Sequence, residues 1–182
     1  VGGDPKVPIT VKHRIGIDQI ESYDYVRDFV GTVADAGCEV FIVHARNAWL
    51  KGLSPKENRE IPPLRYEVVH QLKRDFPHLT IVLNGGLADN ASCVAQLQPG
   101  AMIDGVTLDG VMVGRAAYHN PWLMAEWDEL LFGLPAREQA LTRQAVEAEM
   151  VAYTEREMAR TAGWAHGEVR WPQVIRHILG LY

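Results

Sequence analysis

Short apolar segments alternate with amphipathic segments along the first two-thirds of the 182-residue chain. Four of the apolar segments predict strands, because runs of apolar and β-branched residues bounded by polar or turn residues are typical of buried strands. These segments are Val7–His13, Val40–Val43, Thr80–Leu83 and Val111–Val113. Strands that alternate with helices indicate βα units, so the pattern predicts an α/β fold with a parallel sheet.

The segments between these strands predict three helices, with apolar residues at helical spacing. They are a helix that Ser22 can cap and that ends at Gly37, a helix with Tyr66, Val69 and Leu72 on one face, and a short helix that Asp89 caps and that runs through Leu97. From Pro121 onward the pattern is helical only, with helices predicted over Trp122–Phe132, Arg137–Thr161 and Gln173–Leu181. This change divides the chain into two predicted domains, residues 1–120 and 121–182.

Composition narrows the class of protein without identifying a function. Hydrophobic residues make up 47% of the chain and charged residues 23%, which is typical of a soluble globular protein. No apolar run approaches the roughly 20 residues of a membrane-spanning helix, and the start Val1–Asp4 does not resemble a signal peptide. Cys38 and Cys93 have neither metal-ligand nor disulfide spacing, so a reducing, cytoplasmic setting is expected. The net charge of -5 argues against general nucleic-acid binding, so that contact with RNA requires a local basic patch.

Donor-rich polar residues lie where the first two predicted strands end. Lys12 and Arg14 lie at the end of the first strand, and His44 and Arg46 follow the second. Side chains two positions apart on a strand point to the same face, so each pair is expected to share a direction. In a (β/α)8 barrel the active site lies at this end of the strands.

The ends of the third and fourth strands predict a phosphate site. Asn84-Gly85-Gly86 follows the third strand, and Gly114-Arg115 follows the fourth. Glycines allow backbone N–H groups to approach a phosphate closely, and a guanidinium can bind it through two hydrogen bonds. Barrels commonly bind phosphate after strands seven and eight, so these residues fit that role if the third and fourth strands are the last two strands of a barrel.

Each of these residues has a plainer explanation when it is taken alone. The two glycines could form an ordinary turn, Arg115 a surface ion pair, Lys12 an exposed strand end and His44 a satisfied core histidine. Four consecutive strands that all end in donor-rich residues are hard to explain by packing, so the functional interpretation is favoured for the set. No metal site is predicted, because the chain has neither a His-Glu-x-x-His motif nor a carboxylate cluster.

These motifs, together with the long loop between them, resemble the A-type tRNA-dihydrouridine synthases. The matching segments, in order, are Val11–Asp18, His44–Leu64, Gln71–Pro77, Asn84–Gly86, Val111–Arg115 and Arg176–Leu181. The similarity covers nearly the whole chain, and the loop is its most specific part. The resemblance implies an FMN-containing barrel with a helical domain that docks tRNA. It also implies a reaction in which NADPH is the reductant and the C5–C6 double bond of a D-loop uridine is reduced.

The resemblance implies roles for individual residues as well. Lys12 and His44 would contact the flavin ring, where a cation stabilises negative charge on the reduced ring. The residues that would hold the flavin phosphate are Asn84, Gly85, Gly86, Gly114 and Arg115. The residues expected to contact tRNA are Arg14, Arg46, Lys51, Lys56, Arg59 and Arg176. Of these, Arg14 and Arg46 would join His44 in facing a uracil that is flipped out of the stack.

Part of the family pattern has no counterpart in this chain. The first four strands and the cysteine that protonates the uracil carbon are absent, so no catalytic residue is assigned here, and the segment Pro99–Leu108 is longer than the family's. The expected fold is therefore the C-terminal half of a TIM barrel, strands five to eight, followed by part of an all-α helical domain. Without the cysteine this half is expected to be inactive alone. Its open strand edges are expected to make it either poorly stable or self-associating.

Two other functions fit the same motifs. One is a different FMN- or phosphate-binding barrel oxidoreductase, and the other is a non-catalytic RNA-binding fragment. The basic loop Lys51–Arg65 distinguishes the synthases from the first alternative, because an enzyme for a small substrate does not need it.

Overall fold

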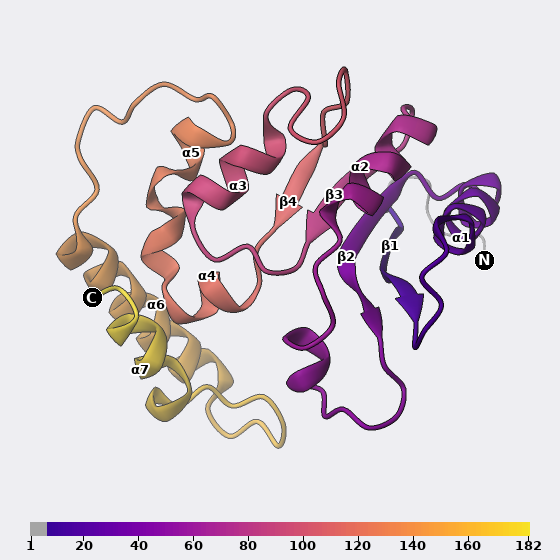
Figure 1. Ribbon diagram of the computed structural model, residues 1–182. Helices are drawn as coiled ribbons and strands as arrows, with labels where there is room; N and C mark the ends of the chain where they lie inside the picture. The colour runs from indigo at the N-terminus through magenta and orange to yellow at the C-terminus, as the bar shows by residue number, and fades with distance from the viewer. Residues whose placement is uncertain (1–6) are drawn as a thin grey trace. The chain divides into compact units, whose positions relative to one another are not determined.

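The four predicted strands are present and pair in the order β1-β2-β3-β4, with all pairs parallel (Figure 1). The computed structural model describes residues 7–182. The segment Val1–Asp4, which is predicted not to be part of a signal peptide, lies outside them. The strands are β1 (Thr10–Ile17), β2 (Val40–Ala48), β3 (Thr80–Asn84) and β4 (Gly110–Met112). The chain divides into two compact units, the first up to Val113 and the second from Gly114 to Tyr182. The domain limits 1–120 and 121–182 stay a prediction.

β1 and β2 continue past the polar residues at which the sequence pattern ends them. Their register runs on from Arg14 opposite His44, through a bulge, to Ile17 opposite Ala48. Ile15, between these positions, is only 2% exposed. The prediction ended both strands too early because Arg14 and His44 lie on one face, while core side chains such as Ile15 and Ala45 continue on the other.

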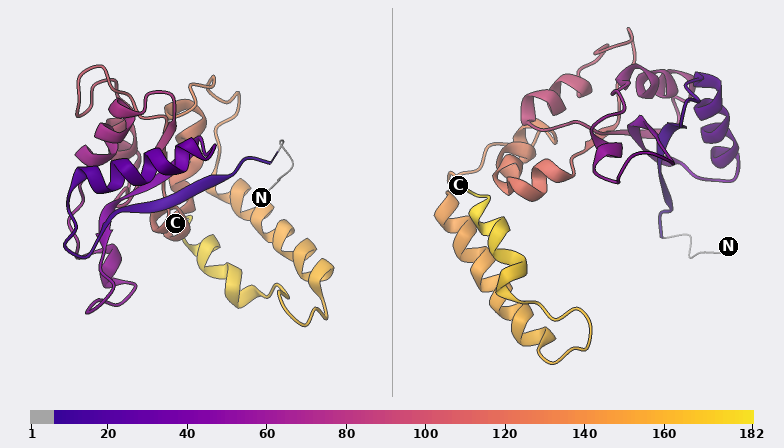
Figure 2. Two further views of the ribbon diagram at one scale, coloured as in Figure 1. Left: turned by 90° about the vertical axis from the view of Figure 1, so that its right-hand side faces the viewer. Right: turned by 60° about the horizontal axis from the view of Figure 1, so that its bottom comes forward.

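Three helices cover one face of the sheet. α1 (Tyr23–Asp35), α2 (Tyr66–Asp75) and α3 (Asn90–Leu97) follow β1, β2 and β3, and Figure 2 shows α1 running along the sheet. The core between them contains Ile15, Phe41, Val43, Ala45, Ile81 and Leu83 from the strands, and Val26, Val30, Val69 and Leu72 from the helices. Because side chains alternate along a strand, the opposite face carries Lys12, Arg14, Ile42, His44, Val82 and Asn84.

The three predicted helices of this unit are confirmed, with one difference at a cap. Asp89 caps α3 as predicted, since its carboxylate accepts a hydrogen bond from the Ser92 N–H at 2.7 Å. Ser22 stands at the N-cap position of α1, but its side chain makes no capping hydrogen bond. The stability of α1 therefore depends on the packing of Val26 and Val30 rather than on its cap.

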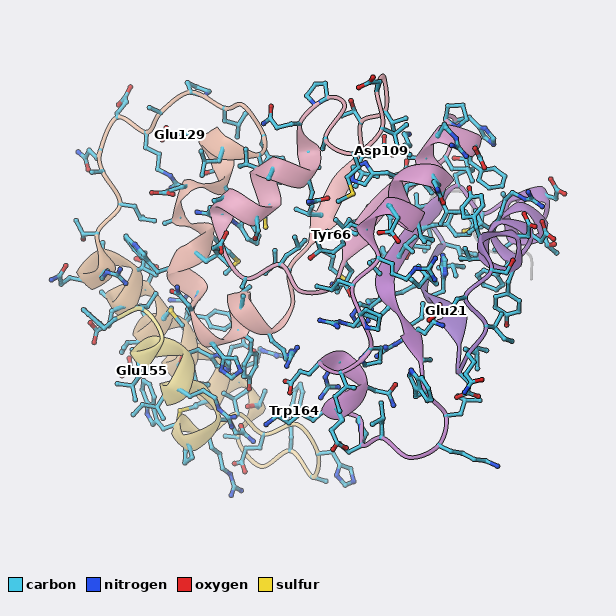
Figure 3. The ribbon with its side chains drawn as sticks, viewed as in Figure 1. Glu21, Tyr66, Asp109, Glu129, Glu155 and Trp164 are labelled. Atoms are coloured by element: carbon cyan, nitrogen blue, oxygen red, sulfur yellow. The ribbon has the colours of Figure 1, made fainter. Side chains whose placement is uncertain are left out.

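A partly exposed ion pair fixes the start of β4. Asp109 accepts hydrogen bonds from Lys73 Nζ at 2.8 Å and from the Ile81 N–H at 2.7 Å. Lys73 Nζ also donates to the carbonyl oxygen of Leu79 at 2.8 Å. These contacts join α2 to the N-terminal ends of β3 and β4, where Figure 3 labels Asp109. The short strand β4 is thus held at its beginning by side chains as well as by its pairing with β3.

The second unit is helical, but two of its predicted helices are wrong in extent. Its elements are α4 (Arg115–His119), the 3-10 helix η2 (Pro121–Glu126), α5 (Trp127–Leu130), α6 (Arg143–Thr161) and α7 (Trp171–Leu179). The predicted helix Trp122–Phe132 is instead η2 followed by the single turn α5. The helix predicted from Arg137 begins only at Arg143, because the Thr142 hydroxyl accepts a hydrogen bond from the Ala145 N–H at 3.1 Å and caps it there. α6 and α7 lie side by side (Figure 2).

A buried histidine makes the stability of the first unit depend on pH. His70 of α2 is 0% exposed, and its Nε2 lies 3.2 Å from Gln96 Oε1. Burial lowers the pKa of this imidazole below its ordinary value of 6.5. In the unfolded chain His70 is therefore protonated at a pH at which the folded chain still holds it neutral. The resulting stability is present above about pH 6.5 and is lost as the pH falls below it.

We expect the chain to melt at a lower temperature at about pH 5.5 than at about pH 7.5. His70→Gln should reduce this difference, because the amide does not titrate. His78 is exposed, so His78→Gln is the matched control and should leave the difference unchanged. Scanning calorimetry at both pH values measures the effect, and an unaltered pH dependence in His70→Gln would contradict the assignment.

Candidate functional site

A row of polar side chains crosses the sheet face opposite α1, α2 and α3. In the register of the sheet, Arg14 is opposite His44, His44 is opposite Asn84, and Asn84 is opposite Met112. Lys12 lies two residues before Arg14 and therefore on the same face. The register thus brings the predicted residues of three strand ends together, while their roles at a cofactor stay predictions.

Five of the predicted site residues line one cavity of about 610 Å3. They are Lys12, Arg14, His44, Arg59 and Asn84. The other lining residues are His13, Gly16, Ile17, Tyr25, Phe29 and Ala48. Since this lining comes from both faces of β1, the cavity extends around the outer edge of β1, which pairs only with β2 in this sheet.

Positive charge accumulates at this cavity. Burial, and then the charge of Arg14, lower the pKa of Lys12. Burial, and then the charges of Arg46 and Arg59, lower the pKa of Arg14. Each cation therefore makes the charged form of its neighbours less favourable, and a bound anion would relieve this repulsion. The site favours a ligand that carries negative charge.

Arg14 and Arg46 hold the loop that follows β2. Arg14 Nη1 donates to the carbonyl oxygens of Asn47 and Asn58, both at 2.8 Å. Arg46 Nη1 donates to the carbonyl oxygen of Glu60 at 3.1 Å. The sequence predicts that both arginines face the substrate, and the structure adds a role in holding the loop. Their contact with a uracil stays a prediction.

Asn58 closes this loop at its base. Its Oδ1 accepts a hydrogen bond from the Trp49 N–H, and its Nδ2 donates to the Trp49 carbonyl oxygen, both at 2.7 Å. The loop that is ordered in this way carries Lys51, Lys56 and Arg59, all exposed. Asn58 is not predicted as a site residue, because nothing in a single sequence distinguishes it from other polar loop residues.

Gly85 and Gly86 form a turn that has no room for a side chain. Both have positive φ, 112° and 71°. A Cβ on Gly85 would lie 2.5 Å from His44 Cδ2, and a Cβ on Gly86 would lie 2.4 Å from Leu64 Cδ1. Asn84, just before the turn, is held by its Nδ2, which donates to the Met112 carbonyl oxygen at 2.7 Å. Such a glycine turn at a strand end is a cradle that an anion can approach closely.

Tyr66 contacts the same turn. Its hydroxyl donates to the Gly85 carbonyl oxygen at 2.7 Å, and Figure 3 labels this residue at the start of α2. Burial raises the pKa of its phenol. The sequence predicts Tyr66 only as an apolar position on a helix face, and so misses this contact. The one signal in the sequence is the hydroxyl of Tyr66 itself, because the other residues of that helix face, Val69 and Leu72, have no polar group.

Three predicted site residues belong to the second unit. Gly114 and Arg115 lie at the start of α4, directly after β4 in the chain, and Arg176 lies in α7. The guanidinium carbon of Arg176 is 5.9 Å from the centre of the Tyr118 ring, within the range of a cation–π interaction. Their roles at the phosphate and at tRNA stay predictions.

Cys38 and Cys93 are both free and buried. In the part of the chain that the structure describes, no three His, Cys, Asp or Glu side chains gather as metal ligands do. None of the helices within residues 7–182 combines the length and the apolar composition needed to cross a membrane.

Known proteins of one family are similar to this chain. The family model described as dihydrouridine synthase (Dus) matches residues 2–180. Similar tRNA-dihydrouridine(20/20a) synthases come from Pseudomonas syringae pv. tomato (52% identity over 175 residues), Vibrio cholerae (49% over 177) and Escherichia coli K12 (48% over 177). The alignments cover 96%, 97% and 97% of this chain, and 47%, 49% and 46% of the relatives. The chain therefore spans about half the length of the curated relatives it matches.

Proposed function

The chain belongs to the dihydrouridine synthase family, and on that basis we propose that it serves the reduction of uridine to dihydrouridine in the D-loop of tRNA, with FMN as cofactor and NADPH as reductant. The row Arg14, His44 and Asn84, which runs directly into the glycine turn at the C-terminal end of a parallel sheet, is the observation that carries the proposal. The ends of parallel strands are where βα enzymes bind their ligands.

The glycine turn fits the phosphate group of FMN. A Cβ on Gly85 or Gly86 would collide with His44 or Leu64, so the turn requires glycine, and its positive φ values suit a backbone that approaches an anion. Asn84, Gly85 and Gly86 would hold the phosphate together with Gly114 and Arg115. When bound, FMN supplies the hydride chemistry that amino-acid side chains lack.

Lys12 and His44 would lie against the flavin ring. Lys12 is on the same sheet face as His44, and its pKa is lowered by burial and by Arg14. Its ammonium would stabilise negative charge at the pyrimidine edge of the flavin. His44 is 9% exposed and packs on Gly85, so its ring would be held in a fixed position between the cavity and the turn.

The loop after β2 would contact tRNA. Lys51, Lys56 and Arg59 are exposed on it, and cations of this kind bind the phosphate backbone. Arg14 and Arg46 would orient the loop and face the flipped-out base, and Arg176 would add a contact from the helical domain, residues 121–182. The proposed location is the cytoplasm, where such a substrate is found.

We further propose that residues 1–120 are strands five to eight of a TIM barrel with their helices. The parallel order of the sheet and the coverage of half of each relative support this assignment. Because β1 and β4 each pair with only one strand of this sheet, the isolated chain would be poorly stable or would self-associate through these edges.

Titration with FMN tests the proposal. The chain should bind FMN weakly, and Arg115→Ala should weaken binding roughly 10- to 150-fold, because a hydrogen bond to a charged group is worth about 1.5–3 kcal/mol. Arg137→Ala is the matched control: it removes one cation from the same unit, where Arg137 pairs with Asp128 at 2.5 Å. An unchanged FMN affinity in Arg115→Ala would remove Arg115 from the phosphate site.

A further inference from the structure

We propose that Tyr66 is a positioning residue for the glycine turn, and that its hydroxyl sets the direction in which the Gly86 N–H points. This inference rests on the proposed function, since it concerns how the turn binds the phosphate of FMN. No role for Tyr66 follows from its place in the sequence pattern, where it is one of the apolar positions of α2.

The tyrosine hydroxyl is itself held in place by the backbone. Tyr66 is the first residue of α2, and the N–H of the preceding Arg65 donates to the Ala45 carbonyl oxygen in β2 at 2.8 Å. The start of the helix is therefore tied to a central strand of the sheet. From this fixed point the hydroxyl reaches the Gly85 carbonyl oxygen at 2.7 Å. That distance is a normal one for a hydroxyl donating to a carbonyl.

The geometry of the peptide bond transmits this contact to Gly86. A trans peptide is planar, and its C=O and N–H point in opposite directions. Because the Gly85 carbonyl is directed to Tyr66, the Gly86 N–H is directed away from Tyr66. Among residues 7–182 no backbone carbonyl oxygen accepts a hydrogen bond from this N–H. It is therefore available to an anion on the side of the turn opposite Tyr66.

Side chains enclose the turn on two sides. A Cβ on Gly86 would meet Leu64 Cδ1 at 2.4 Å and the Tyr66 hydroxyl oxygen at 2.9 Å, while a Cβ on Gly85 would meet His44. Packing thus limits where the turn can lie, but it does not by itself choose between the two orientations of the Gly85–Gly86 peptide. Glycine accepts positive and negative φ with similar ease, so a hydrogen bond is needed to make that choice.

Loss of the hydroxyl should therefore affect anion binding more than folding. In Tyr66→Phe the ring still packs, but the peptide is free to rotate and to direct the Gly85 carbonyl oxygen toward the phosphate. A carbonyl oxygen repels an anion, whereas a preoriented N–H binds it. We expect Tyr66→Phe to bind FMN about tenfold more weakly than the unsubstituted chain.

Tyr23→Phe is a closely matched control. Tyr23 is the first residue of α1, as Tyr66 is of α2, and its hydroxyl donates to Asp75 Oδ2 at 2.6 Å. Each substitution removes one hydroxyl and one hydrogen bond from the start of a helix, but only Tyr66 contacts the turn. Tyr23→Phe should leave the FMN affinity unchanged, and calorimetry should show similar small losses of thermal stability in both variants.

Isothermal titration with FMN and with riboflavin, which lacks the phosphate, completes the test. Tyr66→Phe should reduce the ratio of FMN affinity to riboflavin affinity, and Tyr23→Phe should preserve it. Equal FMN affinity in Tyr66→Phe and the unsubstituted chain overturns the inference and leaves the proposed function standing. Equal losses for both ligands overturn it too, because they indicate a general structural role. Absence of FMN binding by the unsubstituted chain contradicts the proposed function and the inference together.

Discussion

Gly86→Ala is expected to destabilise the chain and to weaken FMN binding by about a hundredfold or more, because it damages the turn by strain and by collision. At a φ of 71° any L side chain is strained, which costs roughly 1–2 kcal/mol. The new Cβ would also meet Leu64 Cδ1 at 2.4 Å, so Leu64 or the turn has to move. Overpacking of this kind costs about 1–3 kcal/mol. The sum is a loss of about 2–5 kcal/mol in the free energy of unfolding.

Gly37→Ala separates the two contributions. Gly37 also has positive φ, 98°, but a Cβ there meets nothing within 4 Å. This control should lose only the strain contribution and should bind FMN as the unsubstituted chain does. Urea denaturation and FMN titration of both variants provide the measurements. If Gly86→Ala is no less stable than Gly37→Ala, the result contradicts the inference that Leu64 packs closely on the turn.

The 182-residue chain alone is expected to form no dihydrouridine from tRNA, even with FMN and NADPH supplied. Reduction of the C5–C6 double bond needs a general acid within hydrogen-bond reach of the uracil carbon. The family resemblance assigns this role to a cysteine that this chain does not contain. Its own cysteines, Cys38 and Cys93, are buried, and burial raises the pKa of the Cys93 thiol. His44, on the polar row, is the one residue of that row that could replace the missing acid.

Mass spectrometry of unmodified tRNA incubated with the chain checks this expectation, since the product uridine gains two hydrogens, about 2 Da. Product from the chain alone would show that the missing acid is dispensable, and His44→Gln would then reveal whether His44 replaces it. Addition of the N-terminal half of a relative is expected to restore activity. Continued inactivity after that addition would favour the alternative of a non-catalytic RNA-binding fragment.

Much of the α/β part of the fold could be predicted from the sequence because its signals are local. Apolar periodicity locates β3 within a residue, and Asp89 marks the beginning of α3. The ends of β1 and β2 could not be predicted, since Arg14 and His44 look like the end of a strand until their pairing across the sheet is known. The interruption of the helix after Pro121 was missed because local apolar spacing does not distinguish a 3-10 turn from an α-helix.

The candidate site shows the same difference between local signals, which the sequence contains, and contacts between distant residues, which it does not reveal. Lys12, Arg14, His44 and Asn84 could be identified because polar residues at the ends of apolar segments are conspicuous. The roles of Asn58 and Tyr66 depend on contacts between residues 9 and 19 positions apart, with Trp49 and Gly85, and no local pattern encodes these. These four residues that line the cavity could thus be predicted from the sequence, whereas Asn58 and Tyr66, which hold the loop and the turn, could not.

The ion pair between Lys73 and Asp109 lies at the opposite end of the strands from the polar row. Substitutions near this pair are therefore expected to have little effect on ligand affinity, whether they accumulate during evolution or are introduced in the laboratory. For protein engineering this means that a more robust variant can be sought by redesigning the segment before β4, while the residues at the other end stay untouched. In barrel enzymes generally, residues at the N-terminal ends of the strands serve stability, and residues at the C-terminal ends serve catalysis.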